Sequence, residues 1–310
     1  MELVPRRSPR RPLSVGLNLP YVEGSLDGAT PRWPDILAMA GSAEEVGFDA
    51  VWVSDHVGFG DPEGDWSGAW ESWTLLSALA SATRAVHLGT YVTAAPFRNP
   101  ALLAKMAETL DEVNGGRAIL GLGAGWNTAE FRAFGFPWER RFDRFEDALR
   151  IVTAMLRDGE ATHDGRLERA DHARLQPRGP RPAGLPVMVG AGGPRMLRLT
   201  AELADDWNAG LRAPGEVGPL LKAVDRACAE VGRNPSTLTR SVEALVRTIP
   251  APDGTDPELR EIRGEPAAIA AELRRFADDG FGHVQVQLRP NRPDAVGAFG
   301  PVLDALCKPG

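Results

Sequence analysis

The sequence lacks the residues and runs that mark secreted, membrane or nucleic-acid-binding proteins. Cysteine occurs only at Cys228 and Cys307 in 310 residues, and two distant thiols indicate neither a disulfide framework nor a metal site. No apolar run approaches the roughly 20 residues of a membrane span. The net charge of −7 offers no basic surface for nucleic acid. We therefore expect a cytoplasmic protein with no nucleic-acid or membrane partner.

Several catalytic motifs are also missing. The sequence contains no G-x-x-x-x-G-K-[ST], no H-E-x-x-H, no C-x-x-C and no G-x-S-x-G. The histidines are too scattered to propose a metal site; they are His56, His87, His163, His172 and His283. The candidate site must therefore be sought in the arrangement of the fold.

What is present is a regular alternation of short apolar runs and longer helical patterns, repeated eight times. The predicted strands cover residues 14–19, 50–55, 86–92, 118–123, 186–190, 206–209, 240–246 and 283–288. Most of these runs are apolar throughout, which is typical of strands buried on both faces of a parallel sheet. Eight such units in roughly 300 residues favour a closed (β/α)8 TIM barrel over a doubly wound open sheet.

The predicted helices have clear ends. Asn99-Pro100 begins one helix, and Asn114-Gly115-Gly116 ends it. The next helix places apolar residues from Phe142 to Met155 on one face and ends at Gly159. The last two helices are predicted over 266–279 and 293–306.

We expect two parts in the chain. Residues 1–12 are basic and proline-rich and are predicted to form a disordered tail, whereas residues 13–310 form a single barrel domain. Two segments exceed ordinary loops. Residues 58–69 follow the second strand and are expected to line the substrate. Residues 159–184 are an insertion after the fourth helix, on the opposite face unless they fold over.

The active site of a parallel barrel is built from the loops that follow its strands, and this rule selects four short sequences. The first is Ser54-Asp55-His56, where His56 could donate a proton or contact a substrate, or Asp55 could simply cap the turn. The second covers residues 88–93, where Gly89 could mark a bulge that lets the backbone approach a flat ligand.

Two glycine-rich turns complete the set. Residues 121–127 lack the last glycine of a dinucleotide fingerprint because Trp126 stands there, so they do not indicate a Rossmann fold. They either let the backbone contact a ring or phosphate, or only pack tightly. Residues 190–195 lead from the fifth strand into a helix, and we expect a cofactor phosphate at that helix N-terminus.

Together these segments resemble the bacterial luciferase-like superfamily of flavin- or deazaflavin-dependent oxidoreductases. The resemblance rests on residues 47–56, 70–74, 88–100, 114–117, 120–135 and 190–194. It is strong over residues 15–210 and continues beyond them only as a barrel pattern. Within the superfamily the chain is most similar to the branch that uses the deazaflavin coenzyme F420. That branch implies a non-prolyl cis peptide near Tyr91-Val92, against the cofactor's central ring.

The resemblance also implies roles for individual residues. His56 would be the catalytic proton donor, and His56, Phe59 and Trp126 would face the substrate. The cofactor-binding residues would be Asp55, Thr90, Tyr91, Val92, Gly123, Ala124, Gly125, Trp126, Ala191, Gly192, Gly193 and Pro194. Sugar-phosphate dehydrogenases of this branch carry Glu where Trp126 stands, so sugar-phosphate oxidation is not expected. A bulky Trp beside the ring suggests an apolar or aromatic substrate.

The leading interpretation is an F420-dependent reductase that transfers hydride from the reduced deazaflavin to an activated C=C or C=N bond of a small organic substrate. The positive charge of Arg140, Arg141 and Arg195 favours F420, because its tail is acidic, although the group around Arg140 is most simply a solvated face. The alternative is a two-component FMN-dependent monooxygenase, which would need a flavin reductase as partner. A minor alternative is a flavin-binding barrel without catalysis. The resemblance implies a homodimer.

Overall fold

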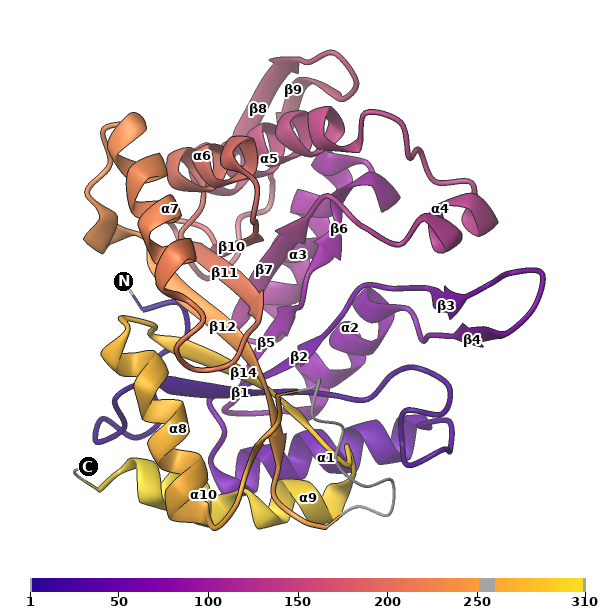
Figure 1. The fold of residues 1–310 in the computed structure, drawn as a ribbon. Helices are drawn as coiled ribbons and strands as arrows, with labels where there is room; N and C mark the ends of the chain where they lie inside the picture. The colour runs from indigo at the N-terminus through magenta and orange to yellow at the C-terminus, as the bar shows by residue number, and fades with distance from the viewer. Residues whose placement is uncertain (1, 251–259, 309–310) are drawn as a thin grey trace.

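Eight parallel strands form the centre of the computed structural model, which describes residues 2–250 and 260–308 (Figure 1). These strands are β1 (Ser14–Asn18), β2 (Ala50–Val53), β5 (His87–Thr90), β7 (Ala118–Gly123), β10 (Val187–Gly190), β11 (Asp206–Leu211), β12 (Thr239–Arg247) and β14 (His283–Leu288). β1 pairs with both β2 and β14, and β7 pairs with both β5 and β10, so the sheet closes on itself. The predicted (β/α)8 TIM barrel is confirmed.

Helices surround this barrel. They are α1 (Trp33–Val46), α2 (Ser72–Ala82), α3 (Pro100–Val113), α4 (Thr128–Phe134), α5 (Arg141–Asp158), α6 (Pro194–Leu203), α7 (Gly218–Glu230), α8 (Pro266–Asp278), α9 (Pro293–Ala298) and α10 (Gly300–Leu306). Asn99 caps α3 by accepting the backbone N–H of Leu102, as its position predicts. The predicted last helix is divided into α9 and α10 at Phe299, because Pro301 has no backbone N–H to continue it.

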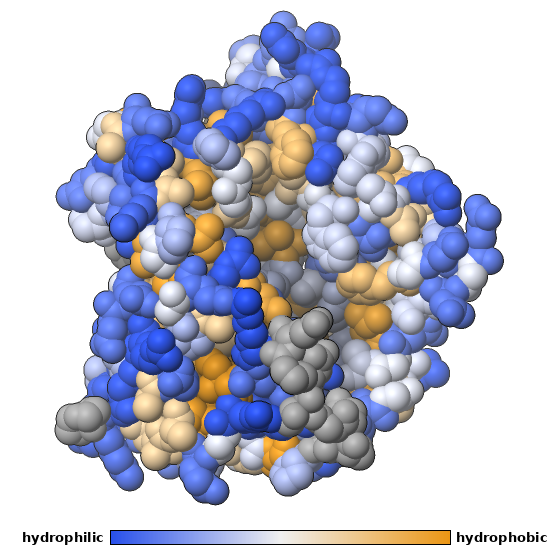
Figure 2. All heavy atoms as spheres, viewed as in Figure 1, coloured by the Kyte–Doolittle hydropathy of each residue, from blue (hydrophilic) through white to orange (hydrophobic). Residues whose placement is uncertain are grey.

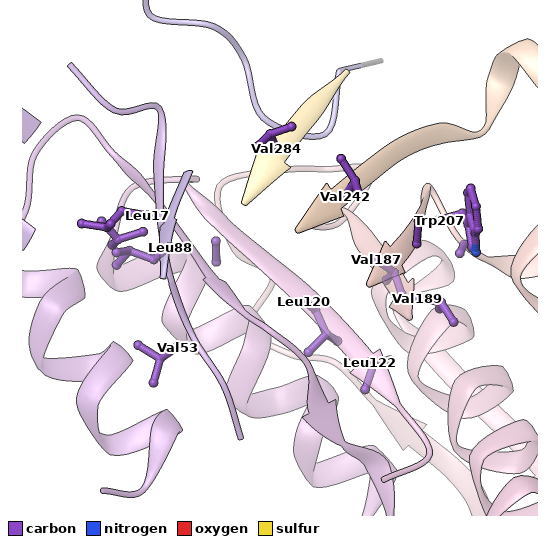
Figure 3. Packing of buried hydrophobic residues seen from close by; sticks show 14 of the residues in the cluster. Leu17, Val53, Leu88, Leu120, Leu122, Val187, Val189, Trp207, Val242 and Val284 are labelled. Atoms are coloured by element: carbon purple, nitrogen blue, oxygen red, sulfur yellow. The ribbon is translucent and has the colours of Figure 1, made fainter. Parts of the chain in front are cut away.

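The apolar core lies mainly between the strands and the helices. Figure 3 shows Leu17 on β1 and Leu88 on β5 near each other, with Val53 further along β2. All three are buried, as the unbroken apolar runs predict. Within residues 2–250 and 260–308, no helix combines the length and the apolar character needed to cross a membrane.

Trp52 fills the barrel interior. A Cβ atom at Gly16 would lie 2.2 Å from its indole nitrogen, and a Cβ at Gly89 would lie 2.1 Å from the far side of the ring. Both glycines are therefore required by the packing of one large side chain. Gly89, considered above as a bulge that admits a ligand, instead makes room for Trp52.

The N-terminal residues close the lower end of the barrel, where the strands begin. Leu3 and Val4 are buried against Trp52, Ile119 and Met188. The prediction of a disordered tail is therefore wrong for residues 2–12, whose few apolar side chains bind to a surface that the local composition does not reveal.

An ion pair holds this N-terminal segment in place. Arg11 and Asp49 are both buried and pair at 2.7 Å. The Asp49 carboxylate also accepts the backbone N–H groups of Arg7 and Val15, at 2.6 and 2.7 Å. A buried charge that is paired and hydrogen-bonded in this way anchors the chain that crosses it.

Both long segments contain antiparallel hairpins. β3 (Gly58–Gly60) and β4 (Trp66–Gly68) project beside α4 (Figure 1). β8 (Glu160–Asp164) and β9 (Arg169–Arg174) lie along α5, and the ion pair of Arg144 with Glu168 ties the hairpin to that helix. The insertion thus folds back along α5 rather than staying at the end where that helix stops.

Candidate active site

A cleft of about 1160 Å³ opens at the end of the barrel where the strands stop. It is lined by residues that follow β1, β2, β5, β7, β10 and β11, as the barrel rule requires, together with Glu243 inside β12 and Gln287 inside β14. Figure 2 shows this face hollowed near its centre, with apolar side chains at depth inside a hydrophilic rim. Every residue predicted for the site except Thr90 lines this cleft.

A histidine–glutamate pair lies on one wall. Nδ1 of His56 is 2.9 Å from Oε1 of Glu130, and Oε2 of Glu130 accepts the backbone N–H of Val57 at 3.1 Å. Because a carboxylate only accepts, Nδ1 of His56 carries the proton in this contact. The pair fixes the orientation of the ring and leaves its other nitrogen outside this contact.

Aromatic rings surround His56. Its ring centroid is 4.7 Å from that of Phe59 on the β3–β4 hairpin and 5.4 Å from that of Trp126. The indole of Trp126 is 66% exposed although it lines the cleft, so it offers an apolar face to a ligand. The three residues predicted to face the substrate are thus together on one wall.

Asp55 lines the same cleft, but its carboxylate is already engaged. Arg98 donates to both of its oxygens, at 2.6 and 3.0 Å. The hydroxyl of Ser72 and the backbone N–H of Ala94 donate as well, at 2.6 and 3.1 Å. Asp55 therefore ties together the segments after β2 and β5, and this contact set fits a structural anchor.

The third barrel strand, β5, is interrupted where it reaches the cleft. β5 stops at Thr90, the Tyr91–Val92 peptide is cis, and β6 (Thr93–Ala94) resumes pairing with β7. The cis peptide stands where the resemblance implies it. Tyr91 and Val92 line the cleft, whereas Thr90 is buried outside it. The Thr90 hydroxyl bonds to both the N–H and the C=O of Gly121, so its predicted contact with the cofactor is corrected.

The first glycine-rich turn is shaped by packing. A Cβ at Gly121 would lie 2.1 Å from the carbonyl oxygen of Thr90, and one at Gly123 would lie 2.7 Å from a methyl of Val92. Gly125 has φ +76° and packs against Phe131. These glycines let β7 approach the Tyr91–Val92 segment, which is the tight-packing interpretation.

The second glycine-rich turn is open. No atom lies within 4 Å of a Cβ built at Gly192 or Gly193, and both residues line the cleft. No side chain caps α6, which begins just after Gly193. Its first backbone N–H groups therefore lack a capping partner and present partial positive charge. A phosphate of a flavin-type cofactor fits this turn.

The arginines differ from the expectation. Arg195 pairs with Asp143 and Glu146, and Arg140 pairs with Asp143, so their charge is largely neutralised. Arg141 lies over the rings of Trp138 and Phe142 and lines the cleft.

A second cation lines the cleft at the end of β11. Among the described residues, no carboxylate forms an ion pair with Arg212 or with Arg141. These two residues, rather than Arg140 and Arg195, provide the cleft's free positive charge.

The cleft floor contains polar residues that sequence reasoning missed. Tyr91 donates its hydroxyl to Asn208 at 3.2 Å and to Glu243 at 3.3 Å. Burial raises the pKa of Glu243 to about 7. Burial also raises the pKa of the Tyr91 hydroxyl well above its usual value, with the nearby Glu243 adding to the effect. Asn208 and Glu243 lie inside the sixth and seventh barrel strands, so a rule that selects the loops after the strands did not find them.

Comparison with known families identifies the barrel. The model of the luciferase-like monooxygenase family matches residues 13–296. The chain belongs to this luciferase-like family. The resemblance inferred from residues 47–56 and the other quoted segments is thereby confirmed.

Two relatives within known protein families are informative. The chain is 32% identical over 192 residues to 5,10-methylenetetrahydromethanopterin reductase of Archaeoglobus fulgidus. The aligned region covers 62% of this chain and 54% of the reductase. The alignment thus spans about half of that reductase. The chain is 31% identical over 275 residues to a phthiodiolone/phenolphthiodiolone dimycocerosates ketoreductase of Mycobacterium kansasii. The aligned region covers 82% of this chain and 74% of the ketoreductase.

Solved structures share the luciferase-like fold. An F420-dependent secondary alcohol dehydrogenase, in complex with an F420-acetone adduct, superposes with a TM-score of 0.79 at 22% identity and covers 95% of this chain and 99% of its own. A monooxygenase from Streptomyces bottropensis superposes with a TM-score of 0.74 at 20% identity and covers 94% and 98%. At such identities the likeness establishes the fold alone.

Proposed function

We propose that this luciferase-like protein is an F420-dependent reductase. It would reduce an activated C=C or C=N bond of a small organic substrate. The observation that carries the proposal is that one cleft joins the open turn at Gly192-Gly193 to the His56–Glu130 pair. A cofactor phosphate and a proton donor thus belong to the same cavity. The named reductase and ketoreductase relatives support reduction as the reaction.

The residues of the chain divide into a binding part and a proton-transfer part. The Gly192-Gly193 turn, Ala191 and Pro194 would hold the phosphate, and the Tyr91-Val92 segment with the turn at 123–125 would lie against the ring. When bound, the deazaflavin supplies the hydride. The protein contributes alignment of donor and acceptor.

His56 would donate the proton that completes the reduction. Glu130 holds the Nδ1–H group, so His56 would act as a donor in its doubly protonated form. That form carries a second proton on Nε2 and returns to the neutral ring when this proton is delivered. Phe59 and Trp126 cover the ring on two sides and would bind an apolar or aromatic part of the substrate next to that nitrogen. A positioned donor of this kind typically contributes about 10²–10⁴-fold to a rate.

The competing function is that of an FMN-dependent monooxygenase with a separate flavin reductase. The solved monooxygenase shares the fold, and FMN needs only the phosphate turn. Arg141 and Arg212 favour F420, because two cations without a carboxylate partner suit an acidic cofactor tail. A homodimer in the cytoplasm completes this proposal.

Anaerobic titration of the purified protein with F420 and with FMN tests the cofactor. We expect F420 to bind more tightly, detected by its fluorescence. Tight FMN binding with none of F420 contradicts the proposal and supports the monooxygenase. Binding of a cofactor without turnover of any C=C, C=N or C=O acceptor supports the non-catalytic barrel.

A further inference from the structure

The floor of the cleft is a rigid polar frame inside a barrel whose interior would ordinarily be filled by bulky branched side chains. Asn18 on β1 donates from Nδ2 to Oε1 of Glu243 at 2.8 Å. Asn208 on β11 donates from Nδ2 to the hydroxyl of Ser241 at 2.9 Å and to Oε1 of Gln285 at 3.1 Å. Four barrel strands therefore contribute to two hydrogen-bonded groups, Asn18–Glu243 and Asn208–Ser241–Gln285, which the Tyr91 hydroxyl joins. The two groups together are defined here as the polar frame.

Tyr91 connects this polar frame to the cleft. Its hydroxyl contacts both Asn208 and Glu243, and its ring packs edge-on against Trp52, with 6.4 Å between the ring centroids. Tyr91 directly precedes Val92, and both residues line the cleft. The position of this segment is thus set by side chains that lie beneath it.

Glu243 is the group of the polar frame whose charge changes near neutral pH. Burial raises its pKa to about 7, against the lowering effect of its bonds to Tyr91 and Asn18. Tyr91 and Tyr21 are the titratable groups that face Glu243, whereas Arg212, whose backbone N–H donates to the Glu243 carbonyl, brings its positive charge to bear on Tyr91. Burial raises the pKa of both tyrosines, so they stay neutral, and the Arg212 guanidinium stays charged.

We propose that Asn208 and Glu243 are positioning residues for the cofactor ring, and that ionisation of Glu243 selectively weakens binding of the reduced cofactor. The inference rests on the proposed function, because it needs a ring on the Tyr91-Val92 segment. A ring that has accepted a hydride is richer in electrons than the oxidised ring. A carboxylate in the floor repels it, whereas the neutral acid does not.

The experiment compares the full-length protein with three variants by anaerobic fluorescence or absorbance titration. F420 and FMN are each used in oxidised and reduced form, at pH 6 and pH 8. Glu243→Gln keeps the shape and is always neutral. Tyr91→Phe removes the hydroxyl that reaches the polar frame. Asp206→Asn is the matched control, because burial raises the pKa of Asp206 to about 7 as well, and Asp206 accepts the hydroxyl of Ser241 at 2.6 Å but lies outside the cleft. An asparagine oxygen can still accept that hydroxyl, so the variant removes the charge and leaves the polar frame bonded.

At pH 6 the unmodified protein and Glu243→Gln should bind the reduced cofactor equally. At pH 8 Glu243→Gln should bind it about tenfold more tightly, the factor expected for coupling of one pKa unit. For the oxidised cofactor at pH 8, the difference in affinity between Glu243→Gln and the unmodified protein should be smaller. Tyr91→Phe should weaken both forms at both pH values, and Asp206→Asn should behave as the unmodified protein.

Three results overturn the inference. In the first, the affinity of Glu243→Gln for the reduced cofactor, divided by that of the unmodified protein, is the same at pH 6 and at pH 8. The second is unchanged binding in Tyr91→Phe, and the third is a gap reproduced by Asp206→Asn. Failure of the proposed function looks different, because then neither cofactor binds the unmodified protein at any pH.

Discussion

The two ends of the barrel use their polar residues in opposite ways. At the lower end, Asp49 receives Arg11 and two backbone N–H groups, and His283 bonds to Ser14 and Trp52. At the cleft, His56 has one nitrogen engaged by Glu130, and the start of α6 has no side-chain cap. Polar groups that the chain itself satisfies serve stability, whereas groups without such partners are available to a ligand.

The titratable groups show the same difference. Burial lowers the pKa of His283 to about 3, so this imidazole is neutral at physiological pH. Burial raises the pKa of Glu243 to about 7, so its charge changes there. Burial raises the pKa of Asp206, at the lower end, to about 7 as well, so the two ends differ in access: Glu243 lines the cleft and Asp206 does not.

The largest effect should come from the histidine pair at the cleft. His56→Ala should lower turnover by about 10²–10⁴-fold, because the positioned proton donor is lost. Cofactor affinity should change little. His163→Ala is the matched control, since His163 also pairs with a carboxylate, that of Asp147 at 3.0 Å, but away from the cleft. Equal losses in both variants would show that neither histidine is specific to catalysis. The measurement is steady-state turnover with reduced F420.

Substitutions at the lower end of the barrel should change the stability of the fold rather than turnover. Asp49→Ala leaves Arg11 buried without its partner and should cost about 3–5 kcal/mol of the free energy of unfolding. Denaturant unfolding measures this loss. Asp171→Ala removes an acid that is 94% exposed and should change stability by less than about 0.5 kcal/mol. An unaltered midpoint for Asp49→Ala would mean that the N-terminal segment does not contribute to the fold.

The glycine turns allow a sharper comparison within the cleft. Gly123→Ala would bring a methyl group to 2.7 Å from Val92 and should destabilise the fold by about 1–3 kcal/mol. Gly193→Ala meets open space at φ −84° and should leave stability unchanged while weakening cofactor binding. Thermal unfolding and cofactor titration of both variants separate the two roles. Similar behaviour of the two variants would contradict the assignment of only the second turn to the phosphate.

The smallest effect is a pH dependence of stability. The folded-state pKa of Glu243 is about 7 and its ordinary value is 4.5, so the folded protein binds more protons between these values. Its contribution to stability is therefore lost as the pH rises through about 7. The melting temperature of Glu243→Gln should lie closest to that of the unmodified protein at pH 4, below both pKa values, and exceed it by a few degrees at pH 8. A constant difference would indicate that Glu243 stays ionised throughout.

Much of the fold could be predicted because its signals are local. The strand at 118–123 has the predicted bounds. Asn99 caps the beginning of α3 and Gly159 caps the end of α5, as their residue types indicate. The two hairpins were missed because their strands carry little apolar alternation: β3 and β4 are short and mostly half-buried, and β8 and β9 are largely exposed. The bound N-terminal segment was missed because its partners, such as Met188, are distant in sequence.

The candidate site was predictable where a motif surrounds the residue. His56 and the 190–194 turn belong to short recognisable sequences, and both line the cleft. Glu130, Asn208 and Glu243 have no such context, because they acquire a role only when separate strands and α4 come together. Thr90 was misplaced because alternation along a strand does not show which residue turns away from the cleft.

The closure of the lower end has a consequence for the order of synthesis. Leu3 and Val4 are synthesised well before Met188 on β10, which forms part of their binding surface. Ser8 also contacts Cys307, with 3.4 Å between its hydroxyl and the thiol. Residues 3 and 4 can therefore reach their final position only after the chain has been synthesised beyond β10, so this segment is fixed in place later than strands that follow it in the sequence.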